Sequence, residues 1–173
     1  LLGLQMANSK NEELKVKLQD SQSRIESIAG IHNLLYNTSN QDLISVKENI
    51  ENSVAYYQKL FPKNVRYHLD IHASLLSIKQ ATPFSLLLNE LINNSNKHAF
   101  AETGNPEIFI YFEKQDKIYV FEYFDNGNFK KQESQKESMG MKIIEMMNKQ
   151  LKGDLKIEST TNFKLTLLFP TNE

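Results

Sequence analysis

From about residue 42 to the end of the chain, stretches with a helical hydrophobic period alternate with β-rich runs. We expect helices over residues 42–61, 82–100 and 138–153, because apolar residues recur there at helical spacing. We expect strands in the segments NVRYHLDI, EIFIYFEK, KIYVFEYF, DLKIES and NFKLTLLF. This order predicts an α+β layer sandwich, with helices on one face of a mixed sheet.

Three residue types indicate where the helices begin and end. Thr82 and Pro83 predict a helix start, because threonine can cap free amides and proline suits the first helical position. Pro62 predicts the end of the preceding helix. Gly153 is expected in the left-handed position after the last helix.

The N-terminal part reads as a separate helical segment. Residues 11–36 contain no proline, and apolar or neutral residues follow heptad-like steps at Leu14, Leu18, Ile25, Ile28, His32 and Leu35. We expect this helix to pack with one ending in LLGLQ, as a helical hairpin that forms half of a dimeric bundle and self-associates. The alternative is an ordinary core helix that folds onto the rest of the chain.

Composition excludes several classes of protein. The net charge of −1 and the pI near 6.5 give no electrostatic footprint for nucleic acid or for an anionic membrane surface. There is no cysteine, so a disulfide framework and a thiolate metal site are excluded. No run of 18 apolar residues could span a bilayer, and the start of the chain does not read as a signal peptide. A cytoplasmic location fits these features best.

The stretch LLLNELINNSNKHAF, residues 86–100, is unusual for a core helix because it carries asparagine at positions 89, 93, 94 and 96. On a 3.6-residue period one broad stripe contains Phe84, Leu88, Leu91, Ile92, Ser95 and Ala99. A second stripe, about a third of a turn away, contains Glu90, Asn94 and Lys97. The helix is therefore predicted to have one buried side and one polar side.

The polar stripe has the residue types that magnesium and phosphate require. Mg²⁺ takes oxygen ligands and keeps waters and substrate phosphates in its shell, so the amide oxygen of Asn94 would suffice as its protein ligand. Glu90, one turn before, could orient or deprotonate a nucleophile, and Lys97 could neutralise phosphate charge. Taken alone, the signal is weak, because an exposed Glu-Lys stripe on an amphipathic helix is usually just a solvated face.

Two later segments add glycines at positions that suit a nucleotide. In DNGNF, Asp125 follows a strand, and Gly127 permits a close backbone approach or a positive φ, although the plain interpretation is a turn. In ESMGMKIIEMM, Gly140 comes just before a helix whose free N–H groups could receive phosphate. The intervening loop is rich in Lys, Gln and Ser.

The three segments, in this order, resemble the asparagine box, first glycine box, flexible lid and second glycine box of the GHKL ATPase superfamily. The segments LLGLQ, SQSRIESIAGIHNLLY and VRYHLDI extend the likeness to a bacterial sensor histidine kinase subfamily with an H-x-x-K-N-N type phosphoacceptor helix. The resemblance covers nearly the whole chain. It implies that residues 1–38 are partial dimerisation and phosphotransfer helices, and that residues 42–173 are a Bergerat-type ATP-binding domain.

The resemblance implies roles for residues that match the family's motifs around the phosphates. Asn94 would hold Mg²⁺, Glu90 would assist the nucleophile as the catalytic residue, and Lys97 and His98 would lie by the phosphates of ATP. From the residues alone, His98 could equally well cap or pack. The implied reaction transfers the γ-phosphoryl group of ATP to a histidine, and then to an aspartate in the receiver domain of a response regulator.

Four further residues are implied to shape the adenine pocket and the cleft. Asp125 would accept a hydrogen bond from the adenine amino group, Gly127 and Gly140 would shape the cleft, and Thr161 would support Asp125. Without the resemblance, Thr161 could be only a strand residue. The implied cofactors are ATP and Mg²⁺, and the implied assembly is a homodimer through the helical segment.

The chain departs from the family's pattern in two places and lacks one feature. Phe129 and Ser138 stand where the glycine boxes often have glycine, which puts lid flexibility in doubt. The phosphoacceptor would lie about a dozen residues before Leu1 by the motif alignment, and none of His32, His68, His72 or His98 occupies its place. An input domain and any membrane anchor are expected upstream.

The departures leave two other functions open. One is a degenerate nucleotide-binding or dimerising regulator without kinase activity, which Phe129 and Ser138 favour. The other is a GHKL ATPase or serine kinase, which LLGLQ and IHNLLY disfavour because such proteins have no place for them.

Overall fold

The computed structural model describes residues 43–61, 64–72, 74–101, 103–128, 139–159 and 162–171, with six single helical residues at 14, 18, 21, 22, 25 and 29. Most of the predicted dimerisation segment, residues 1–38, lies outside the described residues. So do Thr161, Phe129 and Ser138. The division of the chain near residue 40 therefore stays a prediction.

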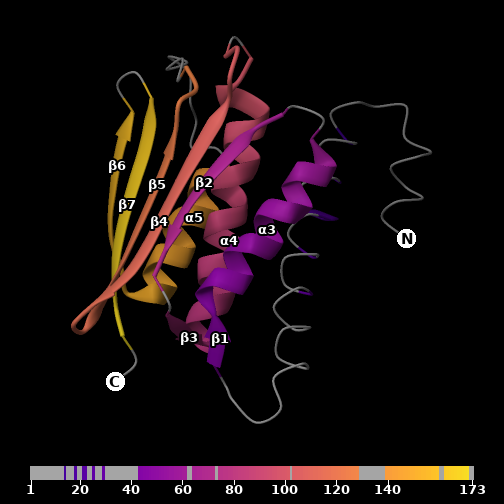
Figure 1. Ribbon diagram of the computed structural model, residues 1–173. Coiled ribbons are helices and arrows are strands. Elements are labelled where there is room, and N and C mark those ends of the chain that lie inside the picture. Colours follow the sequence, from indigo (N-terminus) through magenta and orange to yellow (C-terminus); the bar gives the residue numbers. More distant parts are fainter. Residues whose placement is uncertain are drawn as a thin grey trace.

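A five-stranded sheet forms one layer of the molecule (Figure 1). Its strands are β2 (Arg66–Ile71), β4 (Glu107–Gln115), β5 (Ile118–Asp125), β7 (Phe163–Pro170) and β6 (Asp154–Ser159), in this spatial order. β2 and β4 are parallel, and every other neighbouring pair is antiparallel. All five predicted β-rich runs form these strands, which confirms the mixed sheet.

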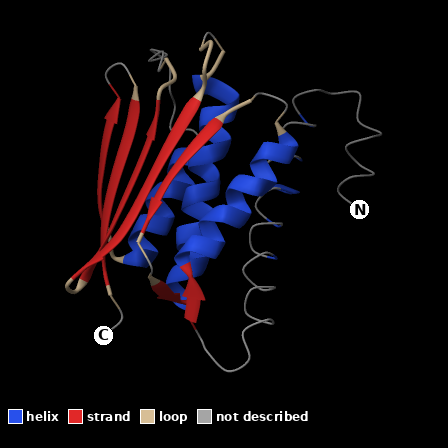
Figure 2. Ribbon diagram, viewed as in Figure 1, coloured by secondary structure: helices blue, strands red, loops and turns tan. Residues whose placement is uncertain are grey.

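Three helices form the second layer and cover one face of this sheet (Figures 1 and 2). They are α3 (Val46–Leu60), α4 (Ile78–Asn94) and α5 (Met139–Leu151). α4 lies between the other two, and the chain continues from it into a π-helical turn, η1 (Ser95–Ala99). The α+β sandwich predicted from the sequence is therefore confirmed.

Aromatic and aliphatic side chains fill the space between the layers. Phe84, on the predicted buried stripe of α4, is fully buried and packs edge-to-face on Phe112 and Phe121 of the sheet, with ring centroids 5.3 and 5.1 Å apart. The other members of that stripe, Leu88, Leu91, Ile92, Ser95 and Ala99, are also buried. Edge-to-face aromatic pairs add about 0.5–1.5 kcal/mol each beyond burial of their area. This packing fixes which side of α4 faces the sheet.

A second, two-stranded sheet was not predicted from the sequence. β1 (Leu43–Ser45) and β3 (Leu75–Ser77) pair antiparallel, and each leads directly into a helix. Ser45 caps α3, since its hydroxyl accepts a hydrogen bond from the Glu48 N–H. Strands of three residues are too short for a two-residue period to be recognised.

The predicted start of α4 at Thr82 and Pro83 is wrong. The helix begins at Ile78, because the chain leaves β3 at Ser77 and turns directly into it, so Pro83 lies inside the helix. The Thr82 hydroxyl donates to the Ile78 carbonyl oxygen, 3.1 Å away, and does not act as an N-cap. Pro83 is the sixth residue of the helix and has no N–H to donate to the Lys79 carbonyl oxygen, so one backbone hydrogen bond of the second turn is absent.

The left-handed residue after α5 is Lys152, with φ of 54°, and not Gly153 as predicted. Gly153 has no positive φ. It is required for a different reason: a Cβ at this position would lie 2.5 Å from Asn148 Oδ1 and 2.5 Å from Leu167 Cδ1. Glycine therefore permits a close approach between the end of α5 and β7.

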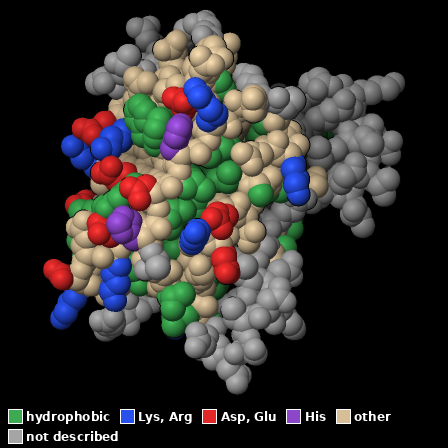
Figure 3. Space-filling model, viewed as in Figure 1, with side chains coloured by type: hydrophobic (Ala, Val, Ile, Leu, Met, Phe, Trp, Pro, Cys, Tyr) green, Lys and Arg blue, Asp and Glu red, His purple; other side chains and the backbone are tan. Residues whose placement is uncertain are grey.

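The surface of the described part carries charges of both signs. Lys, Arg, Asp and Glu side chains are interspersed on the face shown in Figure 3. Across the residues that the structure describes, no helix is both long and apolar enough to cross a membrane.

Candidate functional site

The polar stripe of α4 faces the beginning of α5. A Cβ placed on Gly140 would lie 3.1 Å from Glu90 Oε2 and 3.2 Å from Asn94 Nδ2. Glu90 is only 3% exposed and is therefore buried, whereas Asn94 is half-buried. The structure thus brings together three of the predicted site residues, and the missing Cβ of Gly140 allows the start of α5 to approach the other two closely.

Asp125 lies near the C-terminal end of α4, beside the π-helical turn η1. It is the last residue of β5 and is only 2% exposed. The Ser95 hydroxyl donates to its Oδ2 over 2.6 Å, and the Gly127 N–H donates to its Oδ1 over 3.1 Å. Burial of a carboxylate without such partners would be costly, so these two donors make a buried acid possible here.

The carboxyl group of Asp125 is protonated more readily in its buried position than it would be in water. Burial raises the pKa of Asp125 above 3.8, and the hydrogen bonds from Ser95 and Gly127 oppose this rise by stabilising the charged form. Two donors hold the carboxylate in place, and an ionised carboxylate offers about four lone-pair positions. The group therefore retains capacity to accept a hydrogen bond from a ligand.

Sequence reasoning missed the residues that hold Asp125. Ser95 falls on the predicted buried stripe of α4 and Tyr123 falls within a predicted strand, and neither pattern indicates a role in the site. The Tyr123 hydroxyl lies 2.7 Å from Ser95 Oγ and donates to the Leu91 carbonyl oxygen at 3.3 Å. A serine within an otherwise apolar stripe was the one available signal, since a buried hydroxyl requires a polar partner.

Gly127 is required for the packing of the loop after β5. A Cβ on this residue would collide with the Cβ of Ala99 and approach the Ala99 carbonyl oxygen to 2.6 Å. The next residue, Asn128, donates its backbone N–H to the same carbonyl over 3.1 Å. The loop therefore lies directly against η1, and the predicted close backbone approach is the reason for glycine, since its φ is not positive.

Lys97 and His98 lie in η1, with the Lys97 side chain half-buried and His98 exposed. Single π-helical turns are frequent at functional sites, because they change the direction of side chains near a helix end. Thr161 lies outside the described residues, so its position relative to Asp125 stays a prediction. The other seven predicted site residues lie in α4, in η1, at the end of β5 and in the loop that follows it, and at the start of α5.

The residues present fit Mg²⁺ and a nucleotide better than an all-protein metal centre. Among the residues that the structure describes, no group of three or more His, Asp or Glu side chains is arranged to hold a metal ion. A site built on the Asn94 amide oxygen does not need one, because Mg²⁺ retains waters and phosphate oxygens as ligands. Glu90 and Asn94 lie against Gly140 at the start of α5, so the polar groups that such a ligand requires are gathered there.

Comparison with known proteins yields one family and a consistent fold. Residues 1–61 match the family model described as histidine kinase. No curated protein sequence matches the chain. The family match covers the predicted helical segment, β1 and α3, and does not extend over the candidate site.

Solved structures extend the comparison over the rest of the chain. The histidine kinase domain of the Erythrobacter litoralis EL346 blue-light activated histidine kinase superposes with a TM-score of 0.79 at 12% identity, covering 98% of this chain and 90% of that one. The Acinetobacter baumannii histidine kinase AdeS gives 0.62 at 14% identity, with 95% and 87% covered. The mycobacterial sensor histidine kinase MprB gives 0.60 at 9% identity, with 75% and 96% covered.

At these identities the structural likeness establishes the fold. Together with the family match, it confirms the resemblance to sensor histidine kinases that the ordered motifs indicated.

Proposed function

We propose that the chain is the kinase core of a two-component sensor, which binds Mg-ATP beside α4 and transfers the γ-phosphoryl group to a histidine. The observation that carries this proposal is the placement of Glu90 and Asn94 of α4 against Gly140 of α5. The buried carboxylate of Asp125, at the end of β5, lies beside the C-terminal end of α4. The histidine kinase match over residues 1–61 and the fold support the same class of protein.

Asp125 provides adenine recognition in this proposal. Its two oxygens already accept from Ser95 and from the Gly127 N–H, which fixes the plane of the carboxylate. One of the remaining lone pairs accepts a hydrogen bond from the adenine amino group. A purine without that amino group would leave a buried acceptor unpaired, and such a loss discriminates strongly between ligands.

The residues near Gly140 hold the phosphate end. Asn94 provides the side-chain oxygen for Mg²⁺, and Lys97 and His98 offer positive or donor groups to the phosphate oxygens. When bound, Mg²⁺ would neutralise part of the negative charge of the phosphates, and Asn94 is the residue that would hold it. Gly140 is proposed to lie beside the phosphates, and any side chain there would press on Glu90 and Asn94.

Glu90 is proposed to assist the nucleophile. It lies one helical turn from Asn94, so a histidine nitrogen that approaches the γ-phosphate would come within reach of its carboxylate. Deprotonating or orienting the imidazole in this way is general-base assistance. The acceptor is proposed to be a histidine upstream of Leu1, from which an aspartate of a response regulator receives the phosphoryl group.

Self-association through the N-terminal helix completes the proposal. Leu14 and Ile25, two described residues of this segment, have 47% and 52% of their side-chain surface exposed. They belong to the apolar seam that predicts a dimeric bundle. A cytoplasmic location goes with this function, since ATP and response regulators are found there.

Calorimetry with Mg-ATP tests the binding site. Asn94→Ala should abolish the dependence of ATP binding on Mg²⁺, and Asp125→Ala should reduce selectivity for ATP over a nucleotide that lacks the adenine amino group. Asn52→Ala, an exposed amide on α3, is the matched control and should bind as the wild type does. Equal ATP affinity in the wild type and both site variants would refute the assignment.

A second experiment separates binding from phosphoryl transfer. This chain should bind ATP without acquiring a label from radioactive ATP, whereas a longer chain with the proposed upstream histidine should become labelled. In the longer chain Glu90→Gln should slow labelling about 10²–10⁴-fold with ATP affinity largely retained. Glu145→Gln, an exposed carboxylate on α5, should have no effect. Absence of any nucleotide binding would support the degenerate regulator instead.

A further inference from the structure

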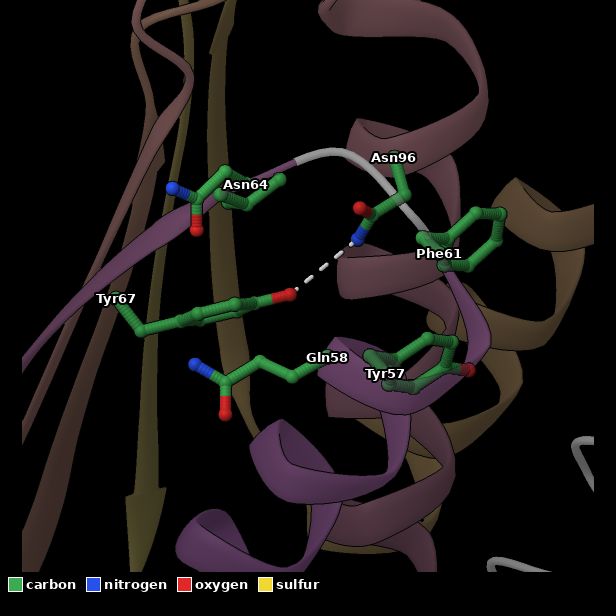
Figure 4. Close-up of a pocket in the computed structure, with 7 residues that line it drawn as sticks. Tyr57, Gln58, Phe61, Asn64, Tyr67 and Asn96 are labelled. Atoms are coloured by element: carbon green, nitrogen blue, oxygen red, sulfur yellow. Dashed lines mark hydrogen bonds between the residues drawn. The ribbon is translucent and has the colours of Figure 1, made fainter.

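The described helices cover one face of the five-stranded sheet, and no described helix or strand covers the other (Figures 1 and 2). Successive side chains of a strand point to opposite faces. Figure 4 shows Tyr67 of β2 directed toward the helical layer, where its hydroxyl accepts a hydrogen bond from Asn96 Nδ2 over 3.4 Å. The residues on either side of Tyr67, Arg66 and His68, therefore lie on the uncovered face, which we call the outer face.

A row of three aromatic rings crosses the outer face. This aromatic row consists of His68, Phe109 and Phe124, which are neighbours across β2, β4 and β5. The His68 and Phe109 rings are stacked, with centroids 4.4 Å apart and planes 8° apart, and the Phe109 and Phe124 centroids are 5.5 Å apart. Phe109 is still 37% exposed. The aromatic row therefore presents ring surface to solvent.

A second row, two residues away along each strand, has a tyrosine between two carboxylates. This acidic row consists of Asp70, Tyr111 and Glu122, which are also neighbours across β2, β4 and β5. The Tyr111 hydroxyl donates to Glu113 Oε2, and the Tyr111 ring contacts the His72 ring edge-to-face, with centroids 5.9 Å apart. Glu113 and His72 lie beyond the acidic row, on the side away from the aromatic row. These contacts hold the Tyr111 ring away from the aromatic row.

A depression of about 390 Å³ lies between the two rows. Members of both rows line it, together with Leu69 and Ile110, the residues of β2 and β4 that separate the rows. It therefore has aromatic rings on two sides and a carboxylate at each end of the acidic row. The face of an aromatic ring attracts a cation, as a carboxylate does, so both parts of the lining favour a positively charged group.

Each of the two carboxylates has a basic neighbour, but these pairs are exposed. Glu122 lies 3.4 Å from Lys164 Nζ, and Asp70 lies 3.5 Å from His72 Nε2. In both pairs at least 40% of each side-chain surface is exposed. Exposed ion pairs contribute only about 0–1 kcal/mol, so a cation that fits the depression better can take their place.

The outer face is also more acidic than the chain as a whole. By the strand register it carries six carboxylates, those of Asp70, Glu107, Glu113, Glu122, Asp154 and Glu158, and three cations, Arg66, Lys156 and Lys164. Six against three leaves an excess of three negative charges on these strands, whereas the whole chain has a net charge of −1. The outer face is therefore complementary to a positively charged partner.

We propose that the depression binds an arginine side chain from a basic segment of a partner protein. The guanidinium plane stacks on the rings of the aromatic row, and its N–H groups donate to the carboxylates of Asp70 and Glu122. Other basic residues of the same segment face the remaining carboxylates of the outer face. This site goes beyond the nucleotide site and does not depend on it, because the helices that carry the nucleotide residues cover the opposite face of the sheet (Figure 1).

The lining distinguishes arginine from lysine. A guanidinium is planar and weakly hydrated, stacks on rings and donates in several directions at once, whereas an ammonium is compact and strongly hydrated. The openness of the depression favours a protein segment over a small cation, since Leu69 and Phe109 in its lining are each 37% exposed. Such an open site buries little of a small ligand, so the arginine serves as the anchor of a larger interface.

Three blocked pentapeptides test the chemistry, with arginine, lysine or citrulline at the second and fourth positions and glycine elsewhere. Citrulline has the shape of arginine without its charge. Binding to the chain is followed by NMR through the backbone amide signals of β2, β4 and β5, at about 0.15 M salt. We expect the arginine peptide to bind with a dissociation constant below about 1 mM, the lysine peptide to bind at least about fivefold more weakly, and the citrulline peptide not to bind. No binding of the arginine peptide, or equal binding of the arginine and lysine peptides, would overturn the proposal.

Variants of the chain test the location of the site. Glu122→Gln should weaken binding of the arginine peptide at least about fivefold, because it removes a charged acceptor. Phe109→Ala should reduce the preference for arginine over lysine, because the ring surface is lost. Asp154→Asn, an exposed carboxylate of β6 on the same face, is the matched control and should bind as the wild type does. An equal loss in Asp154→Asn and Glu122→Gln would show that only the diffuse charge of the outer face attracts the peptide, and would refute the site.

Removing the competing cation should have the opposite effect. Lys164→Gln leaves the Glu122 carboxylate available and should strengthen binding of the arginine peptide about twofold or more. Lys156→Gln is the matched control, since it removes the same charge from the outer face but from a pair with Glu158, and its effect should be smaller. Equal effects of the two changes would contradict the contact with Glu122. A chain that binds the arginine peptide but no ATP would refute the proposed function and still support this site.

Discussion

Ser95 and Asp125 are joined by a 2.6 Å hydrogen bond across the boundary between the helical layer and the sheet. Ser95 begins the π-helical turn after α4, and Asp125 ends β5. The bond therefore fixes a carboxylate of the sheet relative to the helix that carries Glu90 and Asn94. The adenine and phosphate ends of the proposed nucleotide site are thus held in one rigid arrangement.

Replacing Ser95 with alanine should weaken both the fold and the site. The change removes a donor from a buried carboxylate, and such a loss typically costs about 1–3 kcal/mol in the free energy of unfolding. Urea unfolding measures this cost, and calorimetry should show reduced ATP affinity at temperatures where the variant is folded. Ser53→Ala, on α3, is the control. Wild-type stability and ATP affinity in Ser95→Ala would contradict a role for the bond.

Replacing Gly140 with alanine should impair nucleotide binding more than stability. The new Cβ would lie 3.1–3.3 Å from Glu90 Oε2 and the Asn94 amide, so these side chains would have to move away from the positions proposed to hold Mg²⁺. We expect Mg-ATP affinity to fall at least about tenfold, a difference of about 1.4 kcal/mol. Gly104→Ala is the matched control, because a Cβ at that position would have no other atom within 4 Å. Equal ATP affinity in both variants would refute the proposed phosphate position.

The elements with a strong period could be predicted from the sequence. The β4–β5 hairpin, β6, β7 and the buried stripe of α4 follow from alternation and helical spacing over six or more residues. The bond between Ser95 and Asp125 could not, since it joins residues 30 positions apart and depends on how β5 is aligned with the helical layer. The buried Oδ1 of Asn96, which has no hydrogen-bond partner among the described groups, is likewise a consequence of packing, because four asparagines in one helix do not reveal which side each one faces.

The end of α5 provides a prediction about stability. Lys152 has a φ of 54°, which costs a non-glycine residue about 1–2 kcal/mol, whereas Gly153 is constrained by Asn148 and Leu167. Lys152→Gly should therefore leave stability unchanged or raise it by up to about 1 kcal/mol, because glycine's greater freedom in the unfolded chain offsets part of the gain. Gly153→Ala should lower it. Urea unfolding of the two variants should move the midpoint in these directions, and a more stable Gly153→Ala would contradict the close approach.

Exposed apolar residues of the N-terminal helix predict self-association. Leu14 and Ile25 expose about half of their side-chain surface, and burial of that surface against a second copy would stabilise a dimer. Analytical ultracentrifugation should show a dimer that Ile25→Lys converts largely to monomer. Ile157→Lys, on the edge strand β6, is the control and should remain associated. A strict monomer at high concentration in the wild type would contradict the dimerisation role.

Asp125 predicts how stability depends on pH. Because burial raises its pKa above 3.8, the native protein binds this proton more tightly than the unfolded chain does. The contribution to stability is fully present below 3.8 and is lost as pH rises through the raised native pKa. Asp125→Asn cannot titrate. Relative to this variant, the wild type should therefore lose stability on going from about pH 4 to about pH 7.

Urea unfolding of both proteins across this range measures the difference, and NMR of the Asp125 carboxyl carbon measures its pKa directly. Bound Mg-ATP should lower that pKa, because a hydrogen bond from the adenine amino group stabilises the charged carboxylate. A nucleotide without the amino group is the control and should lower the pKa less. If the pKa of Asp125 stayed the same with bound ATP, its carboxylate would not contact the adenine, and the adenine would have to bind elsewhere.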